Sequence, residues 1–337
     1  MLAHFSRKLV RVFSRRRDEN QVMPVIARRI GDAISNDGKK RIASLNQYPT
    51  LDTFRNPLTR GLARHFAHDA WTKALNEIDF EYRLSDVDVG GVPCVHYECG
   101  AATQENPLIL YVHGGAFVCG SPRVNAATVL PVCHLSGCDA IGVDYTLLPE
   151  AVYPTQIDEI DRVYQALRAQ QEDRKIIVVA DSAGANLVLS AMMRWRNDGV
   201  RAPAGAVLLS PLVDGKAVSD THITSDGHDP LIRSMNGRTI KKLFRFYAPE
   251  KALDDPAISP IYGDFKWMPP MLIHVGTREV LLGDAARLTQ IALDAGVDAT
   301  LRVYDGMFHL FHMHWRLKET KAAHADIAKF IEKLNDD

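Results

Sequence analysis

Residues 178–184 read Val178-Val-Ala-Asp-Ser-Ala-Gly184, and this short stretch decides the fold that we expect. It opens on the end of an apolar run, which is typical of a strand buried on both faces. Residues 183–196 are predicted to form a helix. A strand that turns sharply into a helix at a serine lifts the hydroxyl above the edge of a sheet, where it can act as a nucleophile. The turn needs small neighbours, and Ala180 stands where such turns usually have glycine. We therefore predict that Ser182 is a nucleophile.

Predicted strands and helices alternate on both sides of this serine. The strands cover residues 108–112, 140–144, 176–179, 206–209, 271–275 and 299–303. The helices cover residues 126–135, 157–169, 183–196, 284–295 and 315–334. Such alternation predicts an α/β fold, a mostly parallel sheet flanked by helices. Two earlier strands, 80–84 and 92–97, are expected to meet at a Gly90-Gly91 turn.

Two segments are poor in strand-like sequence. In residues 18–77 a helix that begins at Pro24 is expected to end at Asn36-Asp37-Gly38, and residues 57–75 are expected to form a second helix. The other segment lies between residues 214 and 260. Together these segments predict a second layer over the sheet.

A glycine-rich turn follows the first strand of the alternating series. It reads His113-Gly-Gly-Ala-Phe117. Adjacent glycines let backbone N–H groups turn toward a ligand, and a tetrahedral oxyanion needs such donors. We assign donors to Gly115, Ala116 and Ala183, with Gly114 shaping the turn, so that these four residues form the expected oxyanion hole. The alternatives are an ordinary βα turn and a phosphate-binding loop, and the latter lacks the Gly-Lys-Ser or Gly-Lys-Thr that such loops carry.

A serine nucleophile needs a general base. His309 follows the last predicted strand and stands in a loop after Gly306, from which an imidazole can reach Ser182. His312 and His314 compete for this role. Three histidines at this spacing also suit a metal, but the serine machinery already explains His309, and we expect no metal.

The base needs a carboxylate that orients it. Glu279 follows the strand at residues 271–275 and is the expected acid. Asp284 is the alternative, and it also suits the N-cap of the next helix.

Five segments together resemble the hormone-sensitive lipase family of α/β-hydrolases. They resemble its HGG[GA]F, D-Y-R-x-x-P-E, D-S-A-G, D-P-x-x-S-P and G-M-x-H-x-F motifs, in the family's order, at residues 113–117, 144–150, 181–184, 255–260 and 306–311. The resemblance covers residues 80–334. Thr146 replaces the usual arginine, and Glu279-Val-Leu replaces the D-P-L of many members, which looks like the subgroup with a catalytic glutamate.

The resemblance implies an α/β-hydrolase fold with a helical cap. The cap is expected at residues 1–77 and 214–255, and the catalytic domain at residues 78–213 and 256–337. It also implies a serine carboxylic-ester hydrolase with a Ser-His-Glu triad, acting on short- to medium-chain acyl esters without a cofactor. Family members often form homodimers, so a homodimer is one expected state.

The composition excludes several classes of protein. The 337 residues include 40 basic and 41 acidic residues, a formal net charge of −1, so the chain lacks the field of a nucleic-acid binder. Five cysteines without CxxC spacing argue against a disulfide framework or a structural zinc site and are interpreted as reduced thiols of a cytoplasmic protein. No apolar run reaches the roughly 18 residues needed to span a bilayer.

The first 17 residues differ from the nearly neutral chain as a whole, because they include six basic residues and no acidic one. Apolar and basic residues fall on opposite faces of a helix. The pattern suits a helix packed on the protein's own surface, a helix in peripheral contact with a membrane, or a transit peptide.

Two other classes of function remain open from the sequence. A non-catalytic receptor on the same fold is one, although such receptors typically lose the histidine that this chain has. An amidase, deacetylase or formamidase is the other, because the motifs specify acyl transfer and not the leaving group.

Overall fold

The computed structural model describes residues 34–45, 49–100, 102–103 and 105–336. The chain divides into a unit of residues 1–31 and a unit of residues 32–337, and every described residue belongs to the second. The basic segment at residues 1–17 and the helix expected after Pro24 therefore lie outside the described residues. No helix within the described ranges is both long and apolar enough to cross a bilayer.

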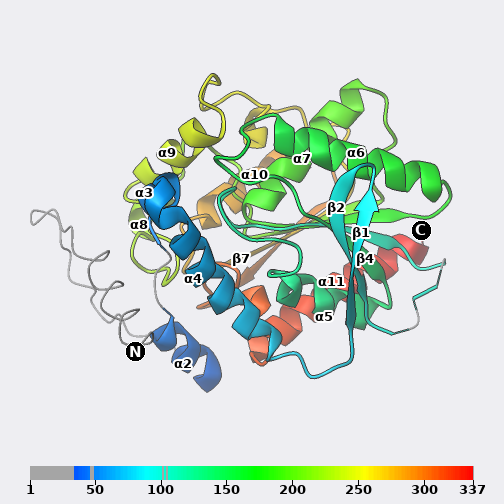
Figure 1. Ribbon diagram of the computed structural model, residues 1–337, viewed down its shortest axis with the longest axis horizontal. Helices are drawn as coiled ribbons and strands as arrows, with labels where there is room; N and C mark the ends of the chain where they lie inside the picture. Colours follow the sequence, from blue (N-terminus) through cyan, green and yellow to red (C-terminus); the bar gives the residue numbers. More distant parts are fainter. Residues whose placement is uncertain (1–33, 46–48, 101, 104, 337) are drawn as a thin grey trace, which may run out of the picture. The chain divides into compact units, whose positions relative to one another are not determined.

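An eight-stranded sheet forms the centre of the described unit (Figure 1), in the order β1-β2-β4-β3-β5-β6-β7-β8. Strands β1 and β2 pair antiparallel, β2 pairs antiparallel with β4, and the remaining neighbours are parallel. The strands are β1 (Arg83–Val89), β2 (Val92–Glu98), β3 (Leu108–Val112), β4 (Asp139–Val143), β5 (Ile176–Asp181), β6 (Gly205–Leu209), β7 (Met271–Gly276) and β8 (Ala299–Tyr304).

Helices cover both faces of this sheet (Figure 1). Alternate residues of a strand point to opposite faces. On β5, for example, Ile177 and Val179 pack in the core that α5 and α11 cover. Val178 and Ala180 pack in the core that α6, α7 and α10 cover. These helices are α5 (Ala126–Ser136), α6 (Thr155–Gln170), α7 (Ala183–Asn197), α10 (Leu282–Asp294) and α11 (Lys318–Asp336).

The remaining helices come from the two strand-poor segments. They are α2 (Asn36–Ser44), α3 (Leu51–Arg55) and α4 (Pro57–Leu75) before the sheet, and α8 (Thr221–Thr224) and α9 (Arg238–Tyr247) after β6; two short 3-10 turns, η1 (Pro260–Tyr262) and η2 (Phe311–Met313), follow. Helices α3 and α9 lie side by side (Figure 1), and the Arg55 guanidinium sits 5.1 Å from the centre of the Phe246 ring.

Three local predictions are wrong. Asn36-Asp37-Gly38 begins α2 instead of ending a helix, because the Ser35 hydroxyl accepts a hydrogen bond from the Gly38 N–H and caps the helix there. The strand predicted at residues 80–84 begins only at Arg83, and the Phe80 ring stacks instead on His134, with ring centres 4.0 Å apart. Asp284 is no N-cap, because α10 already begins at Leu282.

Candidate active site

The serine turn is strained and crowded. Strand β5 ends at Asp181, Ser182 adopts a φ of 51°, and α7 begins at the next residue. Such a positive φ is costly for a residue with a side chain and is often found at functional sites. A Cβ at Gly184 would lie 2.1 Å from the Val112 carbonyl oxygen, so only glycine fits there. The alanine at position 180 is fully buried in the strand itself, before the sharp turn.

Ser182, His309 and Glu279 form a continuous hydrogen-bonded chain. The Ser182 Oγ lies 3.1 Å from His309 Nε2, and His309 Nδ1 lies 2.9 Å from Glu279 Oε2. The other Glu279 oxygen accepts hydrogen bonds from the Ser210 hydroxyl at 2.8 Å and from the Gly276 N–H at 2.7 Å. In the neutral imidazole this geometry assigns the proton to Nδ1, so that Nε2 is free to accept one from the serine.

The electrostatics around His309 favour its protonated form. Burial lowers the pKa of this imidazole, but the hydrogen bond and charge of Glu279 outweigh it, and the pKa is raised above its usual value of 6.5. Two further buried carboxylates, Asp229 and Asp181, add to this rise. An imidazole whose pKa is raised in this way is a stronger base.

The competing residues lie elsewhere. His312 packs against His274 with ring centres 5.6 Å apart, and His314 lies 3.6 Å from a Glu77 oxygen. Asp284 lies 3.1 Å from His222 Nε2 and also accepts a hydrogen bond from a neighbouring serine. Among the described residues, no group of three or more His, Cys, Asp or Glu side chains could hold a metal ion.

The glycine-rich turn after β3 lies beside the serine turn. The Gly114 N–H donates to Asp181 Oδ2 at 2.9 Å, which fits the turn-shaping part that the sequence assigns to it. Gly115 has a φ of 119° and Ala116 a φ of 53°. In these conformations their N–H groups take no part in helix or sheet hydrogen bonding. Within the described residues, the N–H groups of Gly115, Ala116 and Ala183 have no protein acceptor. They can therefore serve an oxyanion.

Sequence reasoning missed the part played by Asp181. This fully buried carboxylate accepts from the Gly114 N–H and from the Tyr111 hydroxyl at 2.7 Å, and so joins the serine turn to the glycine-rich turn. Burial raises its pKa to about 6, against the smaller effect of these hydrogen bonds. Its place in the Asp-Ser-Ala-Gly segment was the signal that could have found it.

Asp229 was missed as well. It lies between α8 and α9, is buried, and accepts a hydrogen bond from the His309 backbone N–H at 3.0 Å. Its other oxygen accepts from the Leu231 N–H at 2.8 Å. Burial raises the pKa of Asp229 to about 6. No local sequence pattern indicates this contact, because Asp229 and His309 are 80 residues apart in the sequence.

An α/β-hydrolase is the class of protein that this sheet and this serine turn define. The comparisons agree with it. The profile of a family described as having an alpha/beta hydrolase fold matches residues 109–313. An esterase from Acinetobacter venetianus is 35% identical over 242 residues, which cover 71% of this chain and 78% of that protein. An acetyl-hydrolase from Streptomyces hygroscopicus is 30% identical over 63% of this chain and 71% of its own length.

Solved structures place the chain more narrowly. The crystal structure of an esterase from the bacterial hormone-sensitive lipase family is 30% identical to it, with a TM-score of 0.77 over 89% of this chain and 96% of that one. The chain belongs to the hormone-sensitive lipase family of α/β-hydrolases and is a carboxylesterase-type hydrolase.

Proposed function

We propose that the protein hydrolyses short- to medium-chain acyl esters through a Ser182-His309-Glu279 triad. The observation that carries this proposal is the unbroken chain of contacts, 3.1 Å from Ser182 to His309 and 2.9 Å from His309 to Glu279. A serine, a base and an orienting carboxylate in this order are what acyl transfer through a covalent intermediate requires.

The first half of the reaction acylates the serine. His309 Nε2 takes the hydroxyl proton while Ser182 Oγ attacks the ester carbonyl. Glu279 holds the ring and stabilises the imidazolium that forms. The backbone N–H groups of Gly115, Ala116 and Ala183 stabilise the oxyanion, each donor by about 3 kcal/mol. The imidazolium then gives its proton to the leaving alcohol.

The second half releases the acid. Water replaces the alcohol, and His309 takes one of its protons as the water oxygen attacks the acyl carbonyl. The same backbone N–H groups hold the second oxyanion. The proton returns to Ser182 Oγ as the carboxylic acid leaves, and the neutral imidazole is restored.

The proposed preference for short- to medium-chain acyl groups is supported by the aromatic residues around the glycine-rich turn. Phe117 ends this turn, is fully buried, and stacks on Tyr247 with ring centres 4.2 Å apart. The Phe244 ring meets Phe117 edge-on at 6.1 Å. These rings fill space beside the expected oxyanion hole, which favours small acyl groups. The acetyl-hydrolase relative supports the same direction.

We also propose that residues 214–255 act as part of a cap that controls access to the serine. Only 5% of Ser182 and 3% of His309 is exposed to solvent. Helix α9 supplies both Phe244 and Tyr247 of the aromatic group that packs on Phe117. Movement of this segment would open the way to the serine.

A series of p-nitrophenyl esters of increasing acyl length tests the proposal. Wild type is expected to turn over the short and medium esters, with a decline at longer chains. Ser182→Ala is expected to lose turnover, while Ser136→Ala, a change at the end of α5, serves as the matched control and keeps it. Turnover that survives Ser182→Ala would refute the triad, and a preference for long chains would refute the acyl preference alone.

A further inference from the structure

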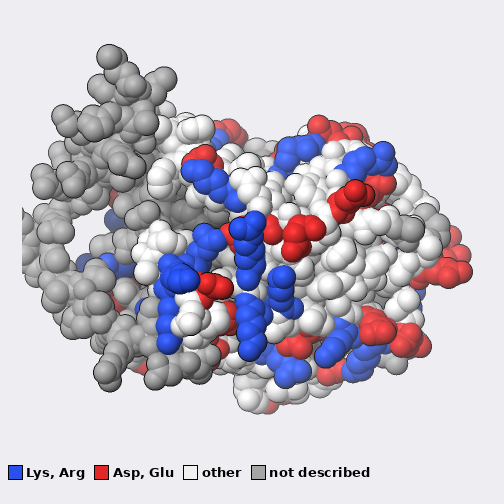
Figure 2. Space-filling model, turned by 90° about the horizontal axis from the view of Figure 1, so that it is seen from below, with Lys and Arg blue, Asp and Glu red and all other residues white. Residues whose placement is uncertain are grey.

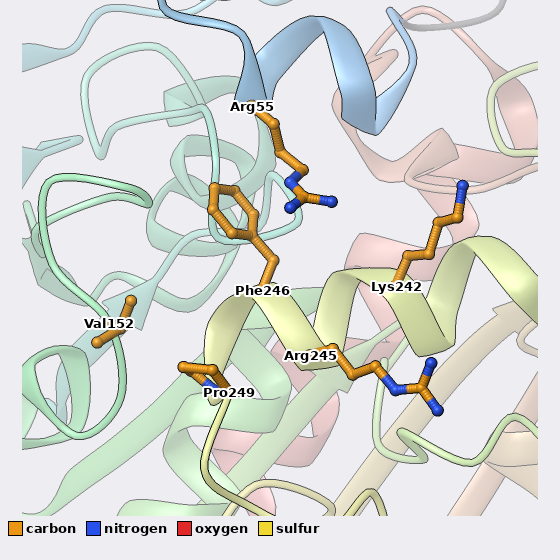
Figure 3. Close-up of a pocket in the computed structure, with 6 residues that line it drawn as sticks. All are labelled: Arg55, Val152, Lys242, Arg245, Phe246 and Pro249. Atoms are coloured by element: carbon orange, nitrogen blue, oxygen red, sulfur yellow. The ribbon is translucent and has the colours of Figure 1, made fainter.

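A surface pocket of about 500 Å³ lies between α3 and α9, outside the proposed active site. Its lining residues are Arg55, Val152, Lys242, Arg245, Phe246 and Pro249. Figure 3 shows Phe246 reaching from α9 toward Arg55 on α3 and Lys242 rising from the same side of α9, while Arg245 extends from the opposite side of that helix in this view. Val152 and Pro249 lie near the C-terminal end of α9.

The pocket carries three cations and no acidic residue. Arg55, Lys242 and Arg245 are exposed, and none forms an ion pair with any carboxylate of the described chain. Neighbouring cations behave differently, since Arg64 pairs with Glu150 at 2.7 Å. Unpaired cations grouped around one hollow create a positive potential there, which attracts an anionic partner.

The other half of the pocket lining is apolar. Phe246 underlies the Arg55 guanidinium, and Val152 and Pro249 complete the lining. Helix α4 begins two residues after α3 ends, and there Leu58 is 93% exposed and Leu62 51% exposed. These two leucines stand three and seven residues after Arg55 of the pocket in the sequence.

We propose that this surface, made of the pocket residues with Leu58 and Leu62, docks on anionic lipid bilayers. A bilayer of anionic lipid offers many phosphates at one level and an apolar layer beneath them. Arginine and lysine heads can meet the phosphates while leucine and phenylalanine side chains enter the layer below. A single phosphate ion would satisfy the cations but would leave the exposed leucines without a partner. The proposal concerns docking and does not depend on the triad.

Basic side chains are also exposed on other parts of the surface. Figure 2 shows a face of the molecule on which lysine and arginine side chains lie among aspartate and glutamate side chains. Exposed lysines outside the pocket, at positions 266, 318 and 329, provide a matched control for total charge.

Co-sedimentation with vesicles tests the docking surface. Full-length Ser182→Ala protein, which leaves lipid intact, is mixed at low salt with vesicles of equal parts phosphatidylglycerol and phosphatidylcholine, or of phosphatidylcholine alone. We expect binding only to the anionic vesicles. Each pocket cation near the surface is worth about a fivefold change in affinity. Arg55→Gln, Lys242→Gln and Arg245→Gln together should weaken binding on the order of 100-fold.

Two further variants make the result specific. Lys266→Gln, Lys318→Gln and Lys329→Gln remove the same charge elsewhere and should change affinity by less than about fivefold. Leu58→Ser should weaken binding without any change of charge. Each variant should keep the melting temperature of its parent, so that a loss of binding reports on the docking surface and not on unfolding.

Two outcomes would overturn the proposal. One is a parent protein that does not bind anionic vesicles at low salt. Another is a triple pocket variant that binds as tightly as its parent, which would assign attachment to another basic segment such as residues 1–17. In the first case, binding of polyglutamate through the pocket cations would assign the surface to an acidic protein instead.

Discussion

The carboxylate of Asp229 accepts a hydrogen bond from the backbone N–H of His309 at 3.0 Å, across 80 residues of sequence. Asp229 belongs to the segment between α8 and α9, whereas His309 follows β8. The carboxylate also holds its own loop through the Leu231 N–H. The position of the proposed base is therefore tied to the segment proposed as a cap, which makes Asp229 a positioning residue.

Asp229→Asn keeps the volume of the side chain and removes its charge. Because the Asp229 charge contributes to the raised pKa of His309, the variant should shift the acid limb of kcat/KM to lower pH. Misplacement of the imidazole should also reduce kcat, by up to about 100-fold. pH–rate profiles of both proteins check this. A profile that keeps its midpoint while only the melting temperature falls would leave Asp229 a purely structural role.

The identity of the acid is tested by a pair of variants. Glu279→Gln removes the carboxylate beside His309 Nδ1 and should lower kcat by about 10⁴-fold, because an amide favours the wrong tautomer. Asp284→Asn changes a carboxylate that contacts His222 instead, so it should lower stability and leave the kcat of the folded protein nearly unchanged. Steady-state kinetics on folded samples would give the reverse pattern if Asp284 were the acid.

Esterase activity should decline with acid because His309 must be neutral to accept a proton. Its pKa is raised above 6.5, chiefly because Glu279 outweighs burial, so the acid limb of kcat/KM should have its midpoint above pH 6.5. A profile from pH 4 to pH 9 with a soluble ester measures it. A rate that stays constant down to pH 4 would speak against this histidine as base.

The protein should also lose stability in acid. Burial lowers the pKa of His113 and His324 to about 4 and that of His274 to about 3. Each such imidazole contributes fully to the free energy of unfolding above pH 6.5, the pKa of histidine in the unfolded chain. Below that pH its contribution falls by about 1.4 kcal/mol per pH unit. Asp181 and Asp229, whose pKa burial raises to about 6, offset part of the loss below pH 6.

Denaturant unfolding at pH 7, 6 and 5 checks this sum. The free energy of unfolding should fall from pH 7 to pH 5. His274→Phe removes one buried imidazole and should reduce that slope by about 1.4 kcal/mol per pH unit, whatever it does to the absolute stability. Stability that rises as the pH falls toward 5 would mean that the two carboxylates outweigh the histidines.

Most of the sheet could be predicted because its strands are short apolar runs between helices. The same regularity brings the proposed triad together, since Ser182, Glu279 and His309 each follow the carboxyl end of a parallel strand. Local sequence patterns gave the wrong helix boundary where a contact with a distant part of the chain also contributes. The fate of residues 36–38 depends on a cap by Ser35, which in turn bonds to Glu319 on α11.

The contacts of the two carboxylates beside the triad could not be predicted for a related reason. Asp181 was visible as part of a motif, but its bonds to Tyr111 and to Gly114 exist only once three segments meet. Asp229 stands in a segment without a periodic pattern, and nothing near it in the sequence indicates its partner. Contacts of this range depend on the packing of the whole chain and leave no local trace.

The central claim is that Ser182 is acylated during turnover. The most direct measurement mixes wild-type protein with a p-nitrophenyl ester, quenches it in acid during the first turnovers, and locates the acyl group by peptide mass spectrometry. The account predicts one acyl adduct, on the peptide that contains Ser182, and its accumulation in Glu279→Gln if the weakened base slows deacylation more than acylation. Turnover with an adduct on a different residue, or with Ser182 unmodified throughout, would contradict it.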